Sequence, residues 1–545
     1  MTYLNRYLVC VAVFIATAGC SADSPDPASA ITADNRPNIL FIVADDLGFT
    51  DLGSFGSEIS TPTLDELALG GLRISNLHAG PACQETRAML MASTGHARAI
   101  ERRPQFEGGE RDNLLSRDWA IIPELLQEAG YATFATGKWD LGWDEGYTPA
   151  TRGFDRSFVQ LGASSSFFRE IFLTRFGLGF EDDGVRLDFD DLSEDFYVTD
   201  HYTDKMLEYL GDAEQGQPWF AFMPYTAPHW PLQLPDDWLD RNAGQYEMGY
   251  DELREQRFRS ALELGVIPAN TSLESYESRA EPWSDLSADK KRRYSRAQEI
   301  YAGMVEHLDM SIGRVIDYLE KSGQLENTVV IFTSDHGAST GEYGVTSADR
   351  LPQGRGPTMP EWIDNRLENF GRINSFVDHG RGFAEAATAP FREAKGSLNE
   401  GGLRAAGFVY YPAQVEAGGI SHAYMTMMDF LPTLMEIAGT QHPGAGTFRG
   451  REINGILGQS AWAHLTGQAE SVHDGSYSVG WSRGGGGALI RGDYKVINTP
   501  LPGQQDATEW RLYDLVDDPG EHNNIAANHP EMVAEMVEDW ETNWR

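Results

Sequence analysis

The sequence predicts an α/β protein with a large central, mostly parallel sheet flanked by helices and a smaller C-terminal α+β domain. Two continuous apolar runs, 37–44 and 327–334, are typical of strands buried on both faces of a parallel sheet. Helical and strand patterns alternate around these runs, as in α/β proteins. From about residue 440 short strands and turns take over, and a terminal helix is expected at 530–544.

The remaining elements follow from local patterns. Thr61-Pro62 suits the N-cap and first position of a helix that Gly70-Gly71 ends. A second helical segment, 87–93, follows a cysteine in a loop. The other expected elements of the large domain are a strand at 72–77, a helix at 119–129, a strand at 131–136, a helix at 201–213, a strand at 219–224, a helix at 295–322, a strand ending at 411 and a helix at 423–438.

The N-terminus has the pattern of a bacterial export signal. Residues 1–19 combine a basic residue with an apolar run too short to span a bilayer. Thr17-Ala-Gly-Cys20 is similar to a lipobox, so we expect a signal peptide of the lipoprotein type and a lipid on Cys20; plain cleavage is the alternative. Residues 20–36 are expected to be a flexible tether. The predicted location is the periplasm or the outer membrane.

Two domains are expected in the mature chain, at 37–440 and 441–545. The large domain carries two insertions. The first, at about 236–295, is charged and weakly apolar, and we expect helices that form a lid-like excursion outside the core. The second, at about 338–394, is rich in glycine and polar residues and is expected to lie over the functional face.

The charge balance excludes some partners. The 545 residues include 82 acidic and 43 basic side chains, a formal net charge of −39. Nucleic acid binding depends on neutralising phosphates with Lys and Arg, so we expect no nucleic acid partner. An anionic bilayer surface is excluded for the same reason, and any membrane contact would come from a lipid on Cys20. We interpret the acidity as a means of solubility.

Cys83 is the strongest candidate for chemistry. Of the three cysteines, Cys10 would leave with the signal peptide and Cys20 would carry the lipid, so Cys83 has no disulfide partner. It precedes a helix, whose N-terminus favours anions. Arg87, four residues later, can hold an anionic oxygen. The pattern indicates a nucleophile for an anionic ester; the alternative is a buried structural cysteine beside a surface arginine.

Polar residues follow each predicted parallel strand, where α/β sheets bind ligands. Asp45 and Asp46 follow the first apolar run, and Asp335 and His336 follow the second. Adjacent carboxylates repel each other unless a cation neutralises them, and a hard divalent ion suits them. A solvated turn is the alternative reading.

Three further polar residues follow the strands at 131–136 and 219–224. Lys138 and Asp140 come after the first of these strands, and they are either part of the site or an exposed ion pair. His229 comes after the second strand, and it is either a general acid or a packed loop histidine.

Together these segments resemble the type I sulfatases of the alkaline phosphatase superfamily, and bacterial arylsulfatases in particular. The likeness begins at about residue 36 and extends to the C-terminus. Its markers are Arg36-Pro-Asn-Ile-Leu, Ala44-Asp-Asp-Leu-Gly48, Gly137-Lys-Trp, Arg152-Gly-Phe-Asp-Arg-Ser157, Ala227-Pro-His-Trp-Pro-Leu-Gln233, Gly313-Arg-Val-Ile-Asp-Tyr-Leu319, Ser334-Asp-His-Gly337 and Leu512-Tyr-Asp-Leu.

The resemblance implies hydrolysis of sulfate esters by a formylglycine made from Cys83, with Arg87 as its anchoring partner. It implies a divalent cation, usually calcium in the family. Lys138 and Lys395 would bind the sulfate oxygens, and His229 would protonate the leaving group. The implied metal ligands are Asp45, Asp46, Asp335 and His336, with the residue at position 83 completing the set. The implied partners are a maturation enzyme and a sulfated small molecule or sulfated polysaccharide.

Three residues differ from the family pattern. Glu85 stands where the maturation enzyme expects Pro or Ala, and Asp140 stands where the family has a histidine that assists release of sulfate. His336 replaces an asparagine, and imidazole favours Mn, Fe or Zn over calcium. Two alternatives therefore stay open beside the sulfatase: a phosphodiester or phosphonate monoester hydrolase on the same scaffold, and a catalytically silent protein that binds an anion.

Overall fold

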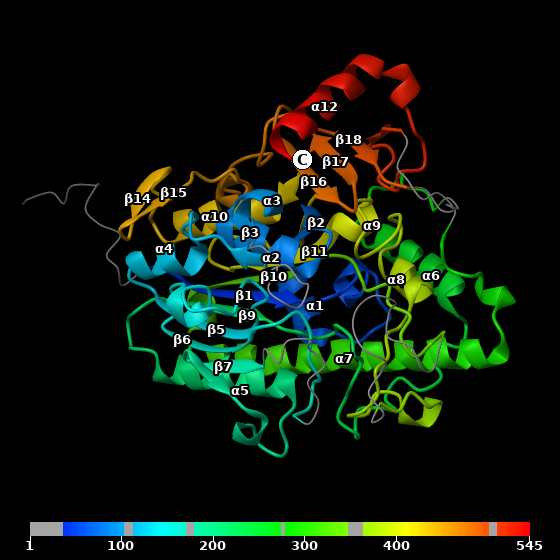
Figure 1. Cartoon of the computed structure of the whole chain (residues 1–545), viewed down its shortest axis with the longest axis horizontal. Helices are drawn as coiled ribbons and strands as arrows, with labels where there is room; N and C mark the ends of the chain where they lie inside the picture. Colours follow the sequence, from blue (N-terminus) through cyan, green and yellow to red (C-terminus); the bar gives the residue numbers. More distant parts are fainter. Residues whose placement is uncertain (1–35, 103–112, 170–178, 274–277, 347–362, 501–508) are drawn as a thin grey trace, which may run out of the picture.

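The computed structural model describes residues 36–545 except 103–112, 170–178, 274–277, 347–362 and 501–508 (Figure 1). The predicted signal peptide and nearly all of the tether therefore lie outside the described residues. The fold is organised around a mixed 11-stranded sheet in which β13 (Met425–Thr426) pairs with β2. The spatial order of the other strands is β12 (Gly419–Ser421), β2 (Leu72–His78), β11 (Arg404–Tyr410), β10 (Thr328–Ser334), β1 (Asn38–Ala44), β9 (Trp219–Pro224), β5 (Ala132–Lys138), β6 (Arg156–Gln160), β7 (Phe180–Asp182) and β8 (Val185–Leu187).

Strand direction brings five strand ends to one edge of this sheet. β10, β1, β9, β5 and β6 run parallel to one another. β11 is antiparallel to both β10 and β2, so β2 runs in the same direction as β10. The carboxyl ends of β1, β2, β5, β9 and β10 therefore meet at the same edge, where α/β sheets bind ligands. The predicted α/β class with a mostly parallel sheet is confirmed.

Helices cover both faces of the sheet, as the continuous apolar character of β1 requires. Leu40 and Ile42 share a core with one set of helices, and Phe41 and Val43 share another core with a second set. The first set is α1 (Pro62–Gly70), α5 (Val198–Asp212) and α7 (Ala288–Lys321), and the second is α2 (Cys83–Ala92), α4 (Ile122–Glu128) and α10 (Phe430–Ile437). Figure 1 shows α7 running the length of the molecule beneath the sheet.

Capping differs from the sequence prediction at two helix starts: α1 begins at Pro62 as predicted but without a cap from the Thr61 side chain, and α7 begins earlier than predicted. The side chain of Thr61 accepts a hydrogen bond from Gly53 N at 3.0 Å and does not cap α1. The Asp309 carboxylate of α7 accepts from Thr63 N and Leu64 N, at 3.2 and 2.8 Å, and takes that role. α7 begins at Ala288 and not at 295, since Ser287 Oγ accepts from Lys290 N at 3.3 Å.

The first insertion is not a lid-like excursion, and this expectation was wrong for its described part. Trp238, Tyr246 and Leu253 are buried in the same core as β1, with Leu253 on α6 (Tyr250–Glu263). Arg257 of α6 is 1% exposed and pairs with Asp51 Oδ1 at 2.5 Å. The charged outer face of the segment hides this apolar content from a composition average.

The C-terminal subdomain is a small antiparallel sheet covered by one helix. Its strands are β16 (Ser478–Arg483), β17 (Gly486–Arg491), β18 (Tyr494–Asn498) and β19 (Arg511–Asp514), and α12 (Pro530–Asn543) packs on β17 and β18 (Figure 1). Before it, β14 (Gly446–Phe448) and β15 (Arg451–Ile453) form a hairpin.

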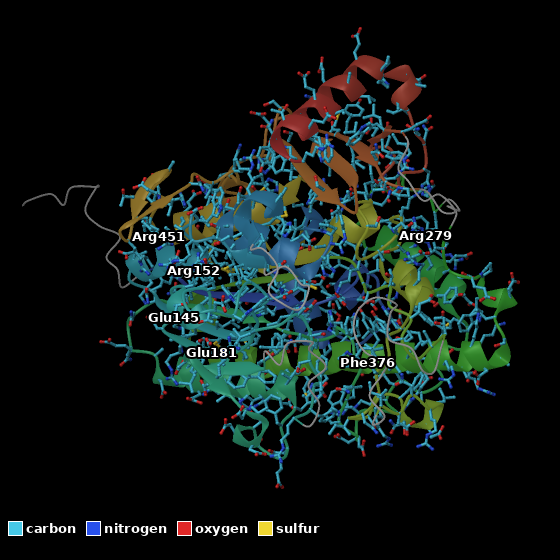
Figure 2. The ribbon with its side chains drawn as sticks, viewed as in Figure 1. Glu145, Arg152, Glu181, Arg279, Phe376 and Arg451 are labelled. Atoms are coloured by element: carbon cyan, nitrogen blue, oxygen red, sulfur yellow. The ribbon has the colours of Figure 1, made fainter. Side chains whose placement is uncertain are left out.

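A partly buried ion cluster attaches this hairpin to the large domain. Arg152 is 1% exposed and its Nε lies 3.1 Å from Glu124 Oε1 on α4. Arg451 of β15 binds the other oxygen of Glu124 at 2.6 Å, and Figure 2 shows the two arginines beside each other.

In the described part of the chain, no helix combines the length and apolar character needed to cross a bilayer.

Candidate active site

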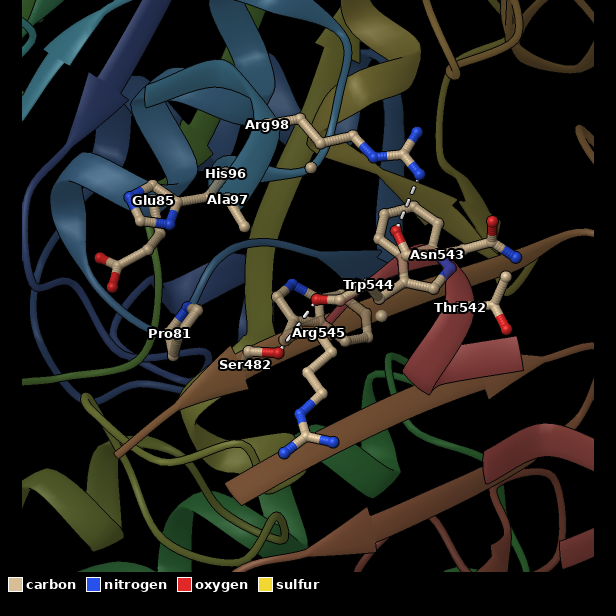
Figure 3. Close-up of a pocket in the computed structure, with 13 residues that line it drawn as sticks. Pro81, Glu85, His96, Ala97, Arg98, Ser482, Thr542, Asn543, Trp544 and Arg545 are labelled. Atoms are coloured by element: carbon tan, nitrogen blue, oxygen red, sulfur yellow. Dashed lines mark hydrogen bonds between the residues drawn. The ribbon is translucent and has the colours of Figure 1, made fainter. Parts of the chain in front are cut away.

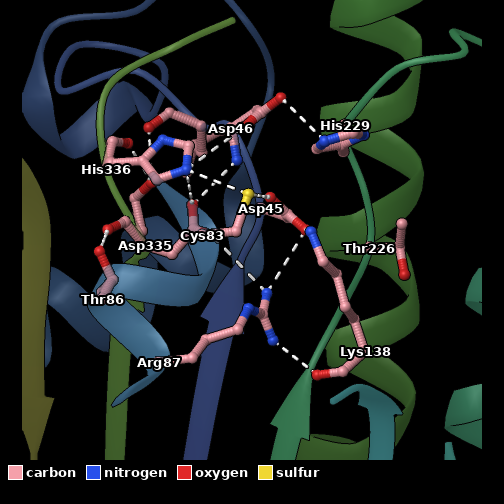
Figure 4. A network of polar contacts seen from close by, with 12 residues as sticks. Asp45, Asp46, Cys83, Thr86, Arg87, Lys138, Thr226, His229, Asp335 and His336 are labelled. Atoms are coloured by element: carbon pink, nitrogen blue, oxygen red, sulfur yellow. Dashed lines mark hydrogen bonds and ion pairs between the residues drawn. The ribbon is translucent and has the colours of Figure 1, made fainter. Parts of the chain in front are cut away.

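The predicted site residues meet at the carboxyl edge of the sheet (Figure 4). Asp45 and Asp46 directly follow β1, and Asp335 and His336 directly follow β10. Lys138 is the last residue of β5, and the loop after β9 carries His229. Gly137 allows this convergence, because a Cβ there would lie 2.1 Å from the carbonyl oxygen of Pro224 in β9.

Cys83 occupies the centre of the cluster. It is the first residue of α2, and not part of a loop before the helix as expected, and it is 6% exposed. Its Sγ lies 3.3 Å from Asp45 Oδ1, 3.3 Å from His336 Nε2 and 3.4 Å from Lys395 Nζ. Burial, and then the charge of Asp45, raise the pKa of the Cys83 thiol well above its ordinary value. The unmodified side chain is therefore a protonated thiol here.

The donor groups around Cys83 fit a divalent cation. Two sets of ligand atoms each lie within 4.8 Å of one another: one from Asp45, Asp46, Cys83 and His229, the other from Asp45, Cys83, Asp335 and His336. Asp46 Oδ2 and Asp335 Oδ2 are buried without a hydrogen-bond partner among the described residues. His336 Nδ1 donates to Gly337 O at 2.8 Å, so its Nε2 carries a lone pair directed at the cluster.

The pKa shifts of the three carboxylates indicate that the site requires positive charge. Burial, and then Asp45, raise the pKa of Asp335 well above its ordinary value. Burial also raises the pKa of Asp46 to about 6, although Lys395 acts in the opposite direction. Burial would raise the pKa of Asp45 too, but Lys138 and other neighbouring cations outweigh it and hold that pKa well below normal. A divalent cation would allow all three carboxylates to ionise.

Three cationic side chains surround the same point. Lys138 Nζ lies 2.5 Å from Asp45 Oδ2, and Lys395 Nζ contacts Asp46 Oδ1. Arg87 is 2% exposed; its Nη1 donates to the carbonyl of Lys138 at 2.6 Å, and its Nη2 lies 3.4 Å from Asp45 Oδ2. Together with the N-terminus of α2, these groups can neutralise a bound oxyanion.

His229 lies at the edge of the cluster. Its Nδ1 donates to Trp230 O at 2.5 Å, so the other nitrogen, Nε2, is the one that can exchange a proton with a ligand. Nε2 lies 3.6 Å from Asp46 Oδ2. Burial, and then Lys395, lower the pKa of His229 well below its ordinary value. An anionic ligand beside the ring would act in the opposite direction.

Asp140 and Glu85 lie outside the central cluster of ligand groups. Asp140 has a φ of 55° just beyond β5, and it belongs to neither set of possible metal ligands among the described residues. Glu85 Oε1 accepts a hydrogen bond from Arg483 of β16 at 2.6 Å. Glu85 also lines a cavity of about 210 Å³ between α2, α3 (His96–Ala99) and the C-terminal subdomain (Figure 3). Its charge is therefore balanced from the C-terminal subdomain.

Sequence reasoning missed the residues that hold the site from behind. Thr86 Oγ1 donates to Asp335 O at 2.6 Å and ties α2 to the end of β10. The Tyr301 hydroxyl of α7 lies 2.6 Å from Asp51 Oδ2 and 3.1 Å from Asp46 O. Thr86 belongs to the cysteine segment and could have been found from it. Tyr301 gave no such signal, because aromatic residues are common on the buried face of a helix.

The fold and the site define an α/β enzyme that acts on an anionic group at the carboxyl edge of its sheet. Comparison with known proteins identifies the family, since the sulfatase family model matches residues 37–440. The chain is 38% identical over 523 residues to an uncharacterized sulfatase of Schizosaccharomyces pombe, covering 93% of each chain. It is 32% identical to the arylsulfatase of Klebsiella aerogenes, covering 74% of this chain and 87% of the relative.

A solved structure shows the same fold. The crystal structure of Ps i-CgsB in complex with k-i-k-neocarrahexaose has a TM-score of 0.64 at 22% identity, covering 93% of this chain and 92% of the other. The chain belongs to the sulfatase family, and it is a sulfuric ester hydrolase. The predictions of the family and of sulfate ester hydrolysis are confirmed.

Proposed function

We propose that the chain hydrolyses sulfate esters with a formylglycine made from Cys83 and a divalent cation held by the surrounding carboxylates. The observation that carries this proposal is the position of Cys83 at the N-terminus of α2. Its Sγ is within 3.4 Å of a carboxylate, an imidazole and an ammonium group. The proposed ligands are Asp45, Asp46, Asp335, His336 and the residue at position 83. The net reaction converts an ester and water into an alcohol, sulfate and a proton.

Each side chain of the site has a separate role in the proposed reaction. The hydrated formylglycine supplies the attacking hydroxyl, and the cation, when bound, polarises a sulfate oxygen. Lys138 and Lys395 bind the other sulfate oxygens, and Arg87 holds the residue at position 83 in place. His229 Nε2 donates a proton to the ester oxygen as the alcohol leaves. In this scheme Asp140, which follows β5, accepts a proton from the nucleophile during release of sulfate.

The nature of the cation is part of the proposal. Calcium suits the three carboxylates, which are hard oxygen ligands. His336 offers an imidazole nitrogen instead of an oxygen, which favours Mn, Fe or Zn. Elemental analysis of protein from its native host, together with reconstitution of metal-free protein by each ion, distinguishes these cases.

The first experiment is mass spectrometry of the tryptic peptide Ile74–Arg87 from protein made in the native host. Formylglycine at position 83, with hydrolysis of an aryl sulfate, supports the proposal. The Cys83→Ala variant is the matched control and should bind metal more weakly and lack turnover. Unmodified Cys83 in a fully active sample would refute the formylglycine mechanism.

His336 also favours a second candidate, a phosphodiester or phosphonate monoester hydrolase on the same scaffold. The two candidates act on esters that carry the same single negative charge, and they differ in the central atom and in the additional organic substituent that the phosphorus esters carry on it. Comparing kcat/KM for 4-nitrophenyl esters of sulfate, phenylphosphonate and a phosphodiester separates them. A preference for the phosphorus esters would favour the second candidate.

We also propose that the enzyme is exported and anchored through a lipid on Cys20. Support comes from the lipobox-like segment and the short apolar run before it. Labelling with a radioactive fatty acid should mark the wild type and not Cys20→Ser. Equal labelling of both would refute lipidation at Cys20.

A further inference from the structure

Three aromatic rings continue directly from the proposed general acid. Trp230, Tyr343 and Phe376, which we call the aromatic wall, have ring centroids separated by 5.1 Å (Trp230 to Tyr343), 5.5 Å (Trp230 to Phe376) and 5.2 Å (Tyr343 to Phe376). The Trp230 ring lies 4.7 Å from the His229 ring. The wall is therefore in contact with the group that would protonate the leaving oxygen.

Two rings of the aromatic wall are partly exposed to solvent, whereas the reacting groups are buried. Cys83 and His229 are only 6% and 3% exposed, whereas Trp230 and Tyr343 are half-buried. Phe376 is 3% exposed and supports both of the other rings. Because the Trp230 ring packs on the His229 ring, Trp230 is the partly exposed ring next to the position at which His229 would meet the ester oxygen.

The segments that form the wall carry no positive charge. Residues 226–234, 338–346 and 374–380 contain no lysine or arginine, and they contribute two acidic residues, Glu342 and Asp378. A glycan with several sulfates needs extra cations outside the reacting centre, and a net charge of −39 adds to its repulsion. The rings of Trp230 and Tyr343 are partly exposed in these segments, and aromatic rings bind flat apolar groups.

We infer that the aromatic wall is the subsite for the alcohol part of the substrate. That part is a flat, uncharged, apolar ring, and the substrate carries a single sulfate. The ring stacks on Trp230, whose orientation Tyr343 and Phe376 hold by edge contacts. This inference rests on the proposed function, since it uses His229 to fix where the ester oxygen lies.

The test compares two esters whose alcohols have equal acidity, phenyl sulfate and a fluorinated alkyl sulfate. Trp230→Ala should lower kcat/KM for phenyl sulfate about tenfold, mainly through KM, the size expected for one aromatic contact. The alkyl ester should change less than about twofold, and Trp230→Phe should restore most of the loss. Trp510→Ala, which removes a ring that packs on Trp540 in the C-terminal subdomain, is the control and should change neither ester.

Two outcomes would overturn the inference. An equal loss on both esters would mean that Trp230 acts only by positioning His229. A wild type that prefers a disulfated glucosamine to phenyl sulfate would show that the wall does not select an apolar ring.

A binding measurement keeps the test independent of turnover. In the Cys83→Ala background, calorimetry should show that Trp230→Ala weakens phenyl sulfate binding about tenfold and leaves methyl sulfate binding unchanged. If the wild type is inactive on both esters after conversion of Cys83, the proposed function fails, and this binding arm still decides the inference. Equal binding of phenyl sulfate with and without the Trp230 ring would refute it.

Discussion

Replacing Lys495 by methionine should destabilise the whole protein by removing one charge from a buried network. Lys495 of β18 is fully buried, and its Nζ lies 2.8 Å from Glu400 Oε1 and 2.8 Å from Glu521 Oε1. Glu400 belongs to α9 (Glu400–Leu403), and its other oxygen binds His78, the last residue of β2. The network therefore joins the C-terminal subdomain to the strand that leads to Cys83.

The expected loss in the free energy of unfolding depends on the partners that Glu400 and Glu521 retain without Lys495. Removing one partner of a buried ion pair costs about 3–5 kcal/mol. Glu400 keeps Arg404 and His78, and Glu521 keeps a hydrogen bond from Glu400 N at 2.9 Å. Methionine also retains most of the apolar volume of the lysine stem. We therefore expect a loss at the lower end, about 3 kcal/mol in the free energy of unfolding.

The assay is urea denaturation followed by tryptophan fluorescence at several pH values. Burial opposes ionisation of Glu400, but His78 and Lys495 outweigh it and hold its pKa well below 4.5. A lowered carboxyl pKa contributes stability above the unfolded pKa and loses it as the pH falls. The difference between wild type and Lys495→Met should therefore be largest at neutral pH and shrink below about pH 4.5.

Two controls make this prediction refutable. Lys321 is 77% exposed and pairs with Asp317 on the same helix, so Lys321→Met should cost less than about 1 kcal/mol. Adding Glu521→Gln to Lys495→Met should recover part of the loss, since it removes an unpaired charge. A loss below about 1 kcal/mol, or one that grows at acid pH, would show that the network does not stabilise the fold as argued.

Four further predictions concern the site and the fold. Asp335→Ala should abolish bound metal and turnover, and unchanged metal content by elemental analysis would remove Asp335 from the ligand set. His229→Ala should reduce kcat far more for alkyl sulfates than for 4-nitrophenyl sulfate, because a good leaving group needs no acid; equal losses would contradict that role. Glu85→Pro should raise the formylglycine fraction measured by mass spectrometry, and an unchanged fraction would mean that Glu85 does not limit maturation. The free energy of unfolding should fall by less than about 1 kcal/mol, because the backbone N–H of the third residue of α2 makes no helical hydrogen bond and the ion pair with Arg483 is partly exposed. Burial raises the pKa of Asp309 from 3.8 to about 6. The stability that protonated Asp309 contributes is therefore full below about pH 4 and is lost as the pH rises to about 6, by up to about 3 kcal/mol. In Asp309→Asn, urea denaturation should show a flatter pH dependence of the free energy of unfolding over this range, and an unchanged slope would contradict the raised pKa of Asp309.

Much of the fold was accessible from local patterns. The buried strands β1, β9 and β10 were predicted within one residue of their ends, because runs of large apolar residues bounded by Pro or charge have few alternatives. The helix predicted at 423–438 begins only at Phe430, because Met425 and Thr426 form β13, and a capping box of Thr426 and Asp429 starts a short 3-10 turn, Met427–Asp429, that leads into the helix. Such caps depend on a few side-chain contacts and are weak signals in a sequence.

By itself, the sequence determined which groups could take part in the chemistry. Carboxylates, an imidazole, a lysine and a cysteine follow buried strands, and in a parallel sheet those strand ends meet at one edge. Only the tertiary structure decided the electrostatics of that edge. Burial raises the pKa of Asp46 to about 6, with Lys395 acting against it and Asp45 with it, and the packing of the C-terminal subdomain pairs Glu85 with Arg483. The physical reason is that charge interactions depend on distance and burial, and strand order and the packing of the C-terminal subdomain set both.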